Sequence, residues 1–334
     1  MNKAFKIFKI IVFAILLLSV FTVGFVFSLL DKINRPDPIT RQAENTPLPG
    51  DEKSAAKITE EKKQELRLTT PKEKIYESTA SESDTIFSNK DIINIMLIGQ
   101  DSRNRKEKGR SDAMILATIN TKDRTISLTS FMRDLYVQIP GYKDNRLNLS
   151  YQLGGMRLLK ETIEKNFHIP VDGNIEVDFK AFEEAVNRIG GIDIEINERE
   201  ARYLGYEKAG VVHMDGRMAL IYARLRAVGN SDYERTERQR KILTAAYDKV
   251  VKMNPVKVID LLNNILPMVT TDMTNTEILR LAGKALSVDF SKPETYRIPV
   301  EGGYKPEIIR GMSVLKPDLD KNRKALQEII YRRK

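Results

Sequence analysis

The amino-acid sequence predicts an α/β protein in which a three-layer α/β/α domain with a central mixed sheet follows one N-terminal transmembrane helix. Two observations support this prediction. Residues 10–30 form an uncharged apolar run, and residues 91–334 alternate short apolar runs with longer segments of helical spacing. Alternating strands and helices favour a sheet that is covered by helices on both faces.

The apolar run at residues 10–30 has the length of a membrane span, because roughly 31 Å of helix at about 1.5 Å per residue matches a bilayer core. A cleaved signal peptide is the alternative, but its apolar region is usually only about 7–15 residues long and ends in a small-x-small site. Lysines at positions 3, 6 and 9 precede the run. They predict a cytoplasmic tail at residues 1–9, a single-pass protein of the cell membrane, and an extracytoplasmic position for residues 31–334.

Residues 31–90 are rich in Pro, Ser, Thr, Lys and Glu and predict an extracytoplasmic linker, because they bury too little apolar surface to offset their ordering entropy. Residues 91–334 contain 41 basic and 34 acidic residues. That excess is compatible with an anionic lipid surface, a wall polymer or a phosphorylated substrate. The chain has no cysteine and two histidines. Thiolate chemistry and histidine-rich metal cages are therefore excluded, and any metal would be a hard cation held by carboxylates.

The periodicity of apolar residues and the positions of turn-forming residues predict the strands and helices of this domain. Apolar runs between turn signals predict strands at 92–98, 113–119, 125–128, 175–177, 192–196 and 296–300. Helical spacing predicts helices at 155–166, 179–189, 219–222, 233–252, 276–286 and 325–333. Residues 120–123 are typical of a hairpin turn between the second and third strands, so these two strands should pair side by side.

Polar residues stand at the ends of three predicted strands. Asp101 follows the first strand and Asp112 leads into the second, so the two carboxylates would meet at one edge if these strands pair. Mg²⁺ (or Mn²⁺) would suit such a pair, because Mg²⁺ uses one or two protein carboxylates when phosphate and water complete its octahedron. The alternative is that both residues only form turns or caps. Arg133 and Asp134 add a cation and a carboxylate after the third strand.

Basic residues crowd into the segment YARLRAVGNSDYERTERQRK, at residues 222–241. The candidate ligand-binding residues in it are Arg224, Arg226, Arg235, Arg238 and Gln239. The first two point to one side of an extended backbone, and the last three are neighbours on a helix. Guanidinium groups bind phosphate oxygens bidentately and stay charged, so the cluster predicts a phosphate or pyrophosphate site. The alternative is a solvated helix face paired with the neighbouring glutamates.

Seven segments between residues 92 and 252 resemble, in sequence and in order, the LytR-CpsA-Psr family of cell-wall phosphotransferases. They are IMLIGQDSR, GRSDAMIL, LTSFMRDLYVQIPG, RLNLSYQLGG, VDFKAFEEAVNRIGGIDIEI, DGRMALIYARLR and DYERTERQRK. The resemblance implies that residues 91–334 are a catalytic domain. Its expected reaction takes an anionic glycopolymer, such as wall teichoic acid or capsule, from an undecaprenyl-pyrophosphate carrier and joins it through a phosphodiester to peptidoglycan.

The resemblance also implies roles for individual residues. Asp101 and Asp112 would hold the metal, and either Asp101 or Asp134 would accept the proton of the attacking hydroxyl. Arg146 stands where the family often has lysine. The implied catalytic residues are Asp101, Arg133, Asp134, Arg224 and Arg226. The implied pyrophosphate-binding residues are Arg133, Arg146, Arg224, Arg226, Arg235, Arg238 and Gln239.

Three other functions fit parts of the pattern. A polyprenyl-pyrophosphate hydrolase would use the same constellation with water, and a lipid- or glycopolymer-binding module would use it without turnover. A transcriptional attenuator would need the basic cluster in the cytoplasm, which conflicts with the predicted topology, so no nucleic-acid partner is expected. For the lipid tail, Phe179, Phe182, Val186 and Ile189 could line an apolar pocket, but we interpret them as ordinary core.

Overall fold

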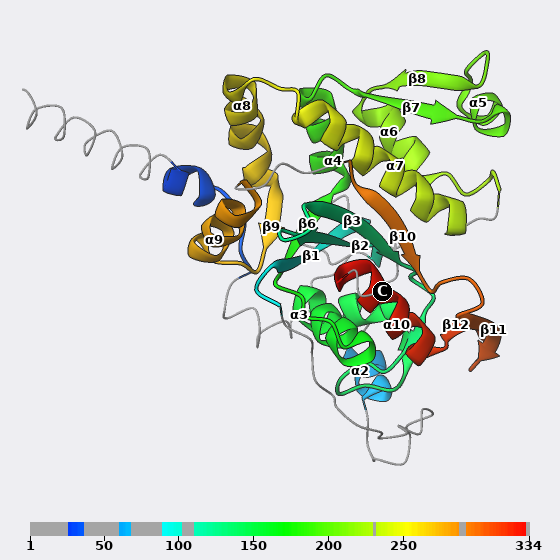
Figure 1. The fold of residues 1–334 in the computed structure, drawn as a ribbon. Coiled ribbons are helices and arrows are strands. Elements are labelled where there is room, and N and C mark those ends of the chain that lie inside the picture. The colour runs from blue at the N-terminus through cyan, green and yellow to red at the C-terminus, as the bar shows by residue number, and fades with distance from the viewer. Residues whose placement is uncertain are drawn as a thin grey trace, which may run out of the picture.

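A six-stranded mixed sheet forms the centre of the fold (Figure 1). The computed structural model describes residues 26–36, 60–67, 89–101, 110–229, 232–286 and 292–331. The strands lie in the order β10-β3-β2-β1-β6-β9, with parallel pairing of β1 with β6 and of β10 with β3. Their bounds are β1 Ile92–Asp101, β2 Arg110–Asn120, β3 Thr125–Phe131, β6 Gly173–Asp178, β9 Val269–Thr271 and β10 Glu294–Ile298. The predicted mixed sheet and the hairpin between β2 and β3 are confirmed.

Helices lie on both faces of this sheet (Figure 1). On one face, α3 (Leu147–Phe167) and α10 (Leu319–Tyr331) enclose the largest apolar core together with Met96, Met114 and Leu116. The opposite face is covered by α4 (Phe179–Arg188), α6 (Gly216–Arg224), α7 (Asp232–Val250) and α9 (Asn275–Leu286). Because successive strand residues point to opposite faces, β1 supplies side chains to both helical layers.

Local chemistry explains where the helices beside the site begin. Strand β6 passes directly into α4 at Asp178, whose carboxylate accepts the backbone N–H of Ala181 at 2.7 Å. Asp215 caps α6 in the same way through the N–H of Met218 at 2.8 Å. A carboxylate at this position satisfies one of the unpaired N–H groups of the first turn. Both helices therefore start at fixed points beside the sheet.

Several elements differ from the sequence-based prediction. Helix α3 begins at residue 147 instead of 155, because it runs across a kink at Gly154 and Gly155, where Gly155 adopts a φ of 62°. Strand β7 (Ile192–Ile196) pairs with β8 (Gly210–Met214) in a separate hairpin and is not part of the central sheet. Its alternating burial shows that only one of its faces is covered. The elements not predicted are β4 (Tyr136–Val137), β5 (Asn145–Arg146), α5 (Glu198–Leu204), α8 (Pro255–Ile265), η2 (Leu266–Met268), β11 (Tyr304–Ile309) and β12 (Met312–Pro317), together with β8 and β9.

Two segments of the predicted linker pack against the domain. Helix α2 (Glu60–Leu66) places Leu66 on an apolar cluster that includes Ile139, and the backbone N–H of Lys143 donates to the Leu66 carbonyl at 2.8 Å. Ile33 is buried, and Asn34 forms a β-bridge with Thr270. Parts of residues 31–90 therefore contact the domain through a few apolar side chains and backbone hydrogen bonds, and the extracytoplasmic linker stays a prediction.

Most of the predicted membrane span, residues 10–25, and the cytoplasmic tail lie outside the described residues. Residues 26–30, at the end of the apolar run, are helical. Within the described part of the chain, no helix has both the length and the apolar character needed to cross a bilayer.

Candidate anion-binding site

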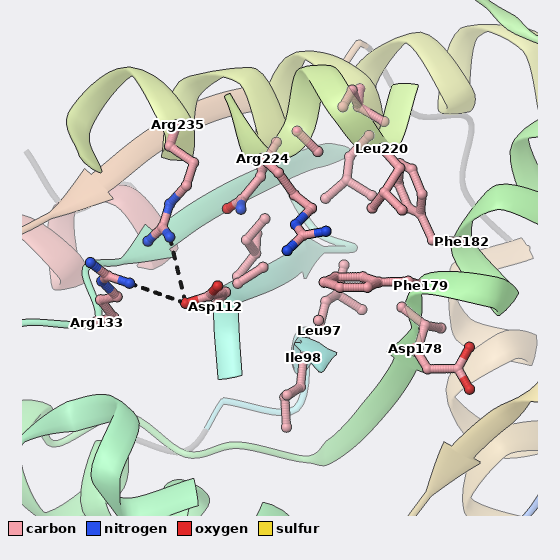
Figure 2. Close-up of a pocket in the computed structure, with 18 of the residues that line it drawn as sticks. Leu97, Ile98, Asp112, Arg133, Asp178, Phe179, Phe182, Leu220, Arg224 and Arg235 are labelled. Carbon is pink, nitrogen blue, oxygen red and sulfur yellow. Dashed lines mark hydrogen bonds and ion pairs between the residues drawn. The ribbon is translucent and has the colours of Figure 1, made fainter. Parts of the chain in front are cut away.

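A cavity of about 490 Å³ lies between the sheet and helices α4, α6 and α7. The strands contribute Leu97, Ile115 and Val177 to its wall, and α4 contributes Phe179 and Phe182. In Figure 2 the aromatic rings of α4 lie toward one end of this cavity, Arg133 and Arg235 lie toward the other, and Arg224 lies between them beside Phe179. The charged lining residues are Asp112, Arg133, Asp178, Arg224, Arg226 and Arg235. The cavity is therefore amphipathic along its length.

The two rings of α4 correct our interpretation of this helix as ordinary core. Phe179 and Phe182 line the cavity, whereas Val186 is buried in a cluster with Ile192 and Met214. The helical spacing is the same in both cases, so periodicity could not separate a cavity wall from a filled core. The difference arises because α6 and α7 leave space above the first turns of α4.

Asp112 reaches the cavity from a β-bulge. Gly99 pairs with Ala113 and Gln100 pairs with Ser111, so Asp112 is the additional residue of β2 with no partner on β1. A bulge of this kind interrupts the ladder and redirects a side chain. The sequence showed an acidic residue beside the second strand, but the register shift that aims its carboxylate is visible only in the structure.

One carboxylate faces three guanidinium groups at this point. Asp112 Oδ1 lies 3.3 Å from Arg133 Nη1 and 3.5 Å from Arg235 Nη1, and its Oδ2 lies 3.3 Å from Arg226 Nη2. Figure 2 shows the Arg133 and Arg235 contacts as dashed lines converging on Asp112. Asp232 also pairs with Arg133 and Arg235, so two carboxylates partly neutralise these three guanidinium groups. Planar guanidinium forks match the oxygens of phosphate or pyrophosphate.

Arg235 is the most enclosed of these cations, with a side chain that is only 3% exposed. Its Nε and Nη1 atoms have no hydrogen-bond partner among the described residues, and neither has Oε1 of Gln239, one helical turn further along α7. Burial lowers the pKa of Arg235, while Asp232 and Asp112 oppose that shift. Buried polar atoms without partners are rare and costly, at about 1–3 kcal/mol each. A ligand bearing acceptor oxygens would satisfy the donors of Arg235.

Arg224 connects the charged and apolar parts of the cavity. It is the last residue of α6, and its guanidinium lies 4.5 Å from the centre of the Phe179 ring. The sequence predicted that Arg224 and Arg226 lie on an extended segment; Arg224 instead ends a helix, and Leu225 is the first extended residue. Both arginines nevertheless line the same cavity, as the pattern indicated.

Arg133 contacts two further carboxylates, those of Asp134 and Asp232. Arg133 Nε donates to Asp232 Oδ2 at 3.1 Å and lies 3.4 Å from Asp134 Oδ2. Burial, followed by the hydrogen bond with Asp232, raises the pKa of Asp134. Burial opposes the shift at Asp232, but the hydrogen bond from Asp134 and the charges of Arg235 and Arg133 lower the pKa of Asp232. Asp134 therefore loses its proton at a higher pH than Asp232 does.

The raised pKa of Asp134 should make the stability of the folded protein depend on pH. Replacing Asp134 with asparagine is expected to remove that contribution. The pKa of Asp134 is higher in the folded protein than its ordinary value of 3.8 in the unfolded chain. Between these two pKa values the folded protein binds more protons than the unfolded chain, so the stability of wild type falls as pH rises through this range. The amide of the variant would donate to Asp232 at every pH. Thermal unfolding of both proteins across the acidic range measures the difference. Parallel melting-temperature profiles would contradict the raised pKa of Asp134.

Arg238, one of the predicted pyrophosphate-binding residues, lies away from the cavity. Its side chain is almost completely buried and does not line the cavity. Nε donates to Glu200 at 2.6 Å, Nη1 donates to the Leu225 carbonyl at 2.8 Å, and Nη2 donates to Val228 and Glu234. Arg235 and Gln239 face the cavity, whereas Arg238 points toward α5. Its four hydrogen bonds instead hold the loop that carries Arg226 against α7.

Arg146 also lies outside the cavity lining. Its Nε is 3.4 Å from Asp134 Oδ1, and its Nη2 donates to the Ser313 carbonyl at 2.6 Å. It therefore contacts the site through Asp134 and connects it to strand β12. Asp232, three residues before Arg235, is a site residue that was not among the predicted catalytic or binding residues. Its spacing on the helix was the available signal.

The side chain of Asp101, one of the two predicted metal ligands, lies outside the described residues. The backbone of Asp101 pairs with that of Arg110, two residues before Asp112, at the end of the hairpin formed by β1 and β2. Among the described residues, no group of three or more His, Cys, Asp or Glu is arranged to hold a metal. The oxygen donor of Asp112 suits a hard cation that would complete its shell with phosphate and water.

An enclosed arginine cluster joined to an apolar cavity defines a protein that binds a phosphorylated amphipathic molecule. Comparison with known proteins agrees, because residues 51–329 match the LytR_cpsA_psr family. The chain belongs to this family.

Individual relatives extend the comparison. The polyisoprenyl-teichoic acid–peptidoglycan teichoic acid transferase TagU of Enterococcus faecalis is 34% identical over 63% of this chain and 72% of that relative. The crystal structure of Bacillus subtilis TagV has a TM-score of 0.58 and 30% identity, covering 73% of this chain and 99% of that one. A structure of TagT bound to LI-WTA has a TM-score of 0.60 and 26% identity, covering 74% and 95%.

Proposed function

We propose that the protein is a phosphotransferase that moves an anionic glycopolymer from an undecaprenyl-pyrophosphate carrier to peptidoglycan and forms a phosphodiester. One observation carries this proposal: a single cavity is lined both by a cluster of arginines and by apolar side chains. A polyprenyl pyrophosphate has the same division between an anionic and an apolar part. The names of the relatives support teichoic acid as the class of polymer.

The proposed reaction needs alignment and charge neutralisation more than a covalent protein nucleophile. A hydroxyl of peptidoglycan attacks the sugar-side phosphorus and forms a new P–O bond. The bond from that phosphorus to the bridging oxygen breaks, and undecaprenyl phosphate leaves with the electron pair. Arg226 and Arg235 would bind the pyrophosphate oxygens, and Arg224 would lie where the anionic head joins the lipid.

Asp101 or Asp134 would accept the proton of the attacking hydroxyl. Once ionised, Asp134 would be the stronger base, because its pKa is raised by burial and by the hydrogen bond with Asp232. Asp101 and Asp112 would hold Mg²⁺ or Mn²⁺, which supplies further neutralisation of phosphate charge. Arg133 would stabilise the same charge while holding Asp112 and Asp232 in place.

We also propose that the domain lies outside the cytoplasm on a single membrane anchor at residues 10–30. The length of that run, the lysines before it and the lipid-linked donor support this topology. No nucleic acid is a partner in this arrangement.

Replacing both Arg224 and Arg226 with alanine is expected to abolish product formation, because two of the cavity's guanidinium groups are lost at once. The assay supplies a short lipid-pyrophosphate glycan, a peptidoglycan oligomer and Mg²⁺, and mass spectrometry identifies the products. Wild type should form glycan–phosphate–peptidoglycan. A matched control is Arg157→Ala, since Arg157 is exposed on α3 and pairs only with Glu161 among the contacts found for it.

Two other outcomes would replace the proposal. Release of phosphorylated glycan without transfer to peptidoglycan would identify a hydrolase that uses water as the acceptor. Retention of the donor by wild type with no product of either kind would identify a binding module. Equal transfer by wild type and the double variant would show that these arginines are not the anion site.

A further inference from the structure

Helix α8 exposes an apolar face that the proposed transfer reaction does not use. It is an 11-residue helix, none of whose residues is fully buried. Val256, Ile259 and Leu262 recur every three residues and have exposed fractions of 77%, 40% and 39%. Val251, in the turn before the helix, is 57% exposed. Residues at this spacing lie along one side of a helix, so Val256, Ile259 and Leu262 form an apolar edge of α8, and Val251 precedes it in the chain.

Hydrogen bonds hold the residues that follow the apolar N-terminal run beside α8. Lys32 Nζ donates to Asn263 Oδ1 of α8 at 2.7 Å, and Asn34 Nδ2 donates to the Pro267 carbonyl at 2.6 Å. Figure 1 shows the helical turn at residues 26–30 lying between α8 and α9. Leu30 is buried at this position, while Phe27, one turn earlier, remains 37% exposed.

We infer that the apolar edge of α8 lies in the interfacial region of the lipid bilayer, next to the point where the chain leaves the membrane. This inference rests on the proposed anchor at residues 10–30. The anchor run ends at Leu30, and two residues later Lys32 already contacts α8. The helix is thus held close to the bilayer surface by the chain itself, and burial of its exposed apolar side chains in lipid is favourable.

Charges around the helix fit the same surface. Lys252 and Lys257 are exposed at its N-terminal end, where anionic headgroups would attract them. Asp260 is the acidic residue of the helix, and its Oδ2 lies 3.7 Å from Arg188 Nη1 of α4. Helix α4 also supplies Phe179 and Phe182 to the cavity wall. Docking of α8 would therefore hold the cavity's apolar wall near the membrane that contains a lipid-linked donor.

The experiment uses the absence of cysteine from the natural chain. Val256→Cys and Ile259→Cys each receive one environment-sensitive fluorophore in the full-length protein. The control is Val211→Cys on strand β8, which is 73% exposed on the separate hairpin. The proteins are reconstituted into vesicles of phosphatidylcholine and phosphatidylglycerol, some of which contain lipids with a quencher near the headgroup. Circular dichroism confirms that each labelled variant is folded.

Probes at positions 256 and 259 should show blue-shifted emission and several-fold stronger quenching by the labelled lipids than the probe at position 211. Equal emission and quenching at all three positions would overturn the inference. Alkaline extraction of the same vesicles separates the two proposals. Protein that resists extraction but lacks quenching on α8 would keep the anchor and reject the docked helix. Extracted protein that also lacks quenching would reject both.

Discussion

Replacing Arg235 with lysine is expected to lower the rate of glycopolymer transfer by about 10²–10³-fold, the usual cost of losing one preorganised donor to a transition-state oxygen. Lysine keeps the positive charge but loses the planar fork, so it cannot contact two phosphate oxygens in the same geometry. The Arg235 side chain is enclosed beside Asp112 and Asp232, and its Nε and Nη1 have no hydrogen-bond partner among the described residues. The measurement is single-turnover transfer at saturating donor.

The matched control for this prediction is Arg157→Lys, which makes the same chemical change at a surface position on the other side of the sheet. Both variants should have melting temperatures close to that of wild type. If the Arg235 variant transferred polymer at the wild-type rate, charge alone would be sufficient at this position. The proposed recognition of phosphate oxygens by the Arg235 fork would then be wrong.

Replacing Arg238 with alanine is expected to reduce the free energy of unfolding by about 3–5 kcal/mol, the usual cost of removing one partner of a buried ion pair. Glu200, which is 3% exposed, would lose the donor that lies 2.6 Å from its Oε1. The carbonyls of Leu225 and Val228 would lose their donors as well. Urea unfolding followed by circular dichroism measures the change, and transfer should decline only because less protein is folded.

A second variant separates charge from packing at this pair. Glu200→Gln retains an acceptor for Arg238 and is expected to cost less stability than Arg238→Ala. A result in which Arg238→Ala unfolds like wild type but loses donor binding would restore Arg238 to the anion site. Together, Arg235→Lys and Arg238→Ala therefore distinguish the proposed recognition of phosphate by Arg235 from the structural support provided by Arg238.

The central part of the fold could be predicted from the sequence because its signals are local. Buried strands gave apolar runs of the right length, and residues 120–123 connect β2 to β3 in an antiparallel hairpin. The beginning of α3 was missed because two glycines interrupt the helical pattern. Strand β7 was recognised, but its pairing with β8 depends on a partner with weak alternation and an exposed surface.

For the candidate site, too, the sequence predicted which residues take part but not how each of them is oriented. Residue types and spacing identified Asp112, Arg133, Arg226 and Arg235, and the structure brings the three guanidinium groups within 3.5 Å of the Asp112 carboxylate. Spacing could not decide which residues of α7 face the cavity. Arg235 and Arg238 have the same chemistry and lie three residues apart on α7. Arg235 nevertheless lines the cavity, whereas Arg238 is buried in the protein interior.

The sequence by itself determined the class of chemistry: a chain without cysteine, with guanidinium groups and carboxylates at strand and helix ends, and with motifs of one family. These properties depend only on which residues occur and on their order over short stretches of sequence, and both are the same in the folded and the unfolded chain. The tertiary structure decided which arginine lines the cavity and which is buried beside Glu200, how the bulge aims Asp112, and where α8 lies beside the end of the apolar run. Those outcomes depend on contacts between residues far apart in the chain, because burial and register are set only when the elements pack together.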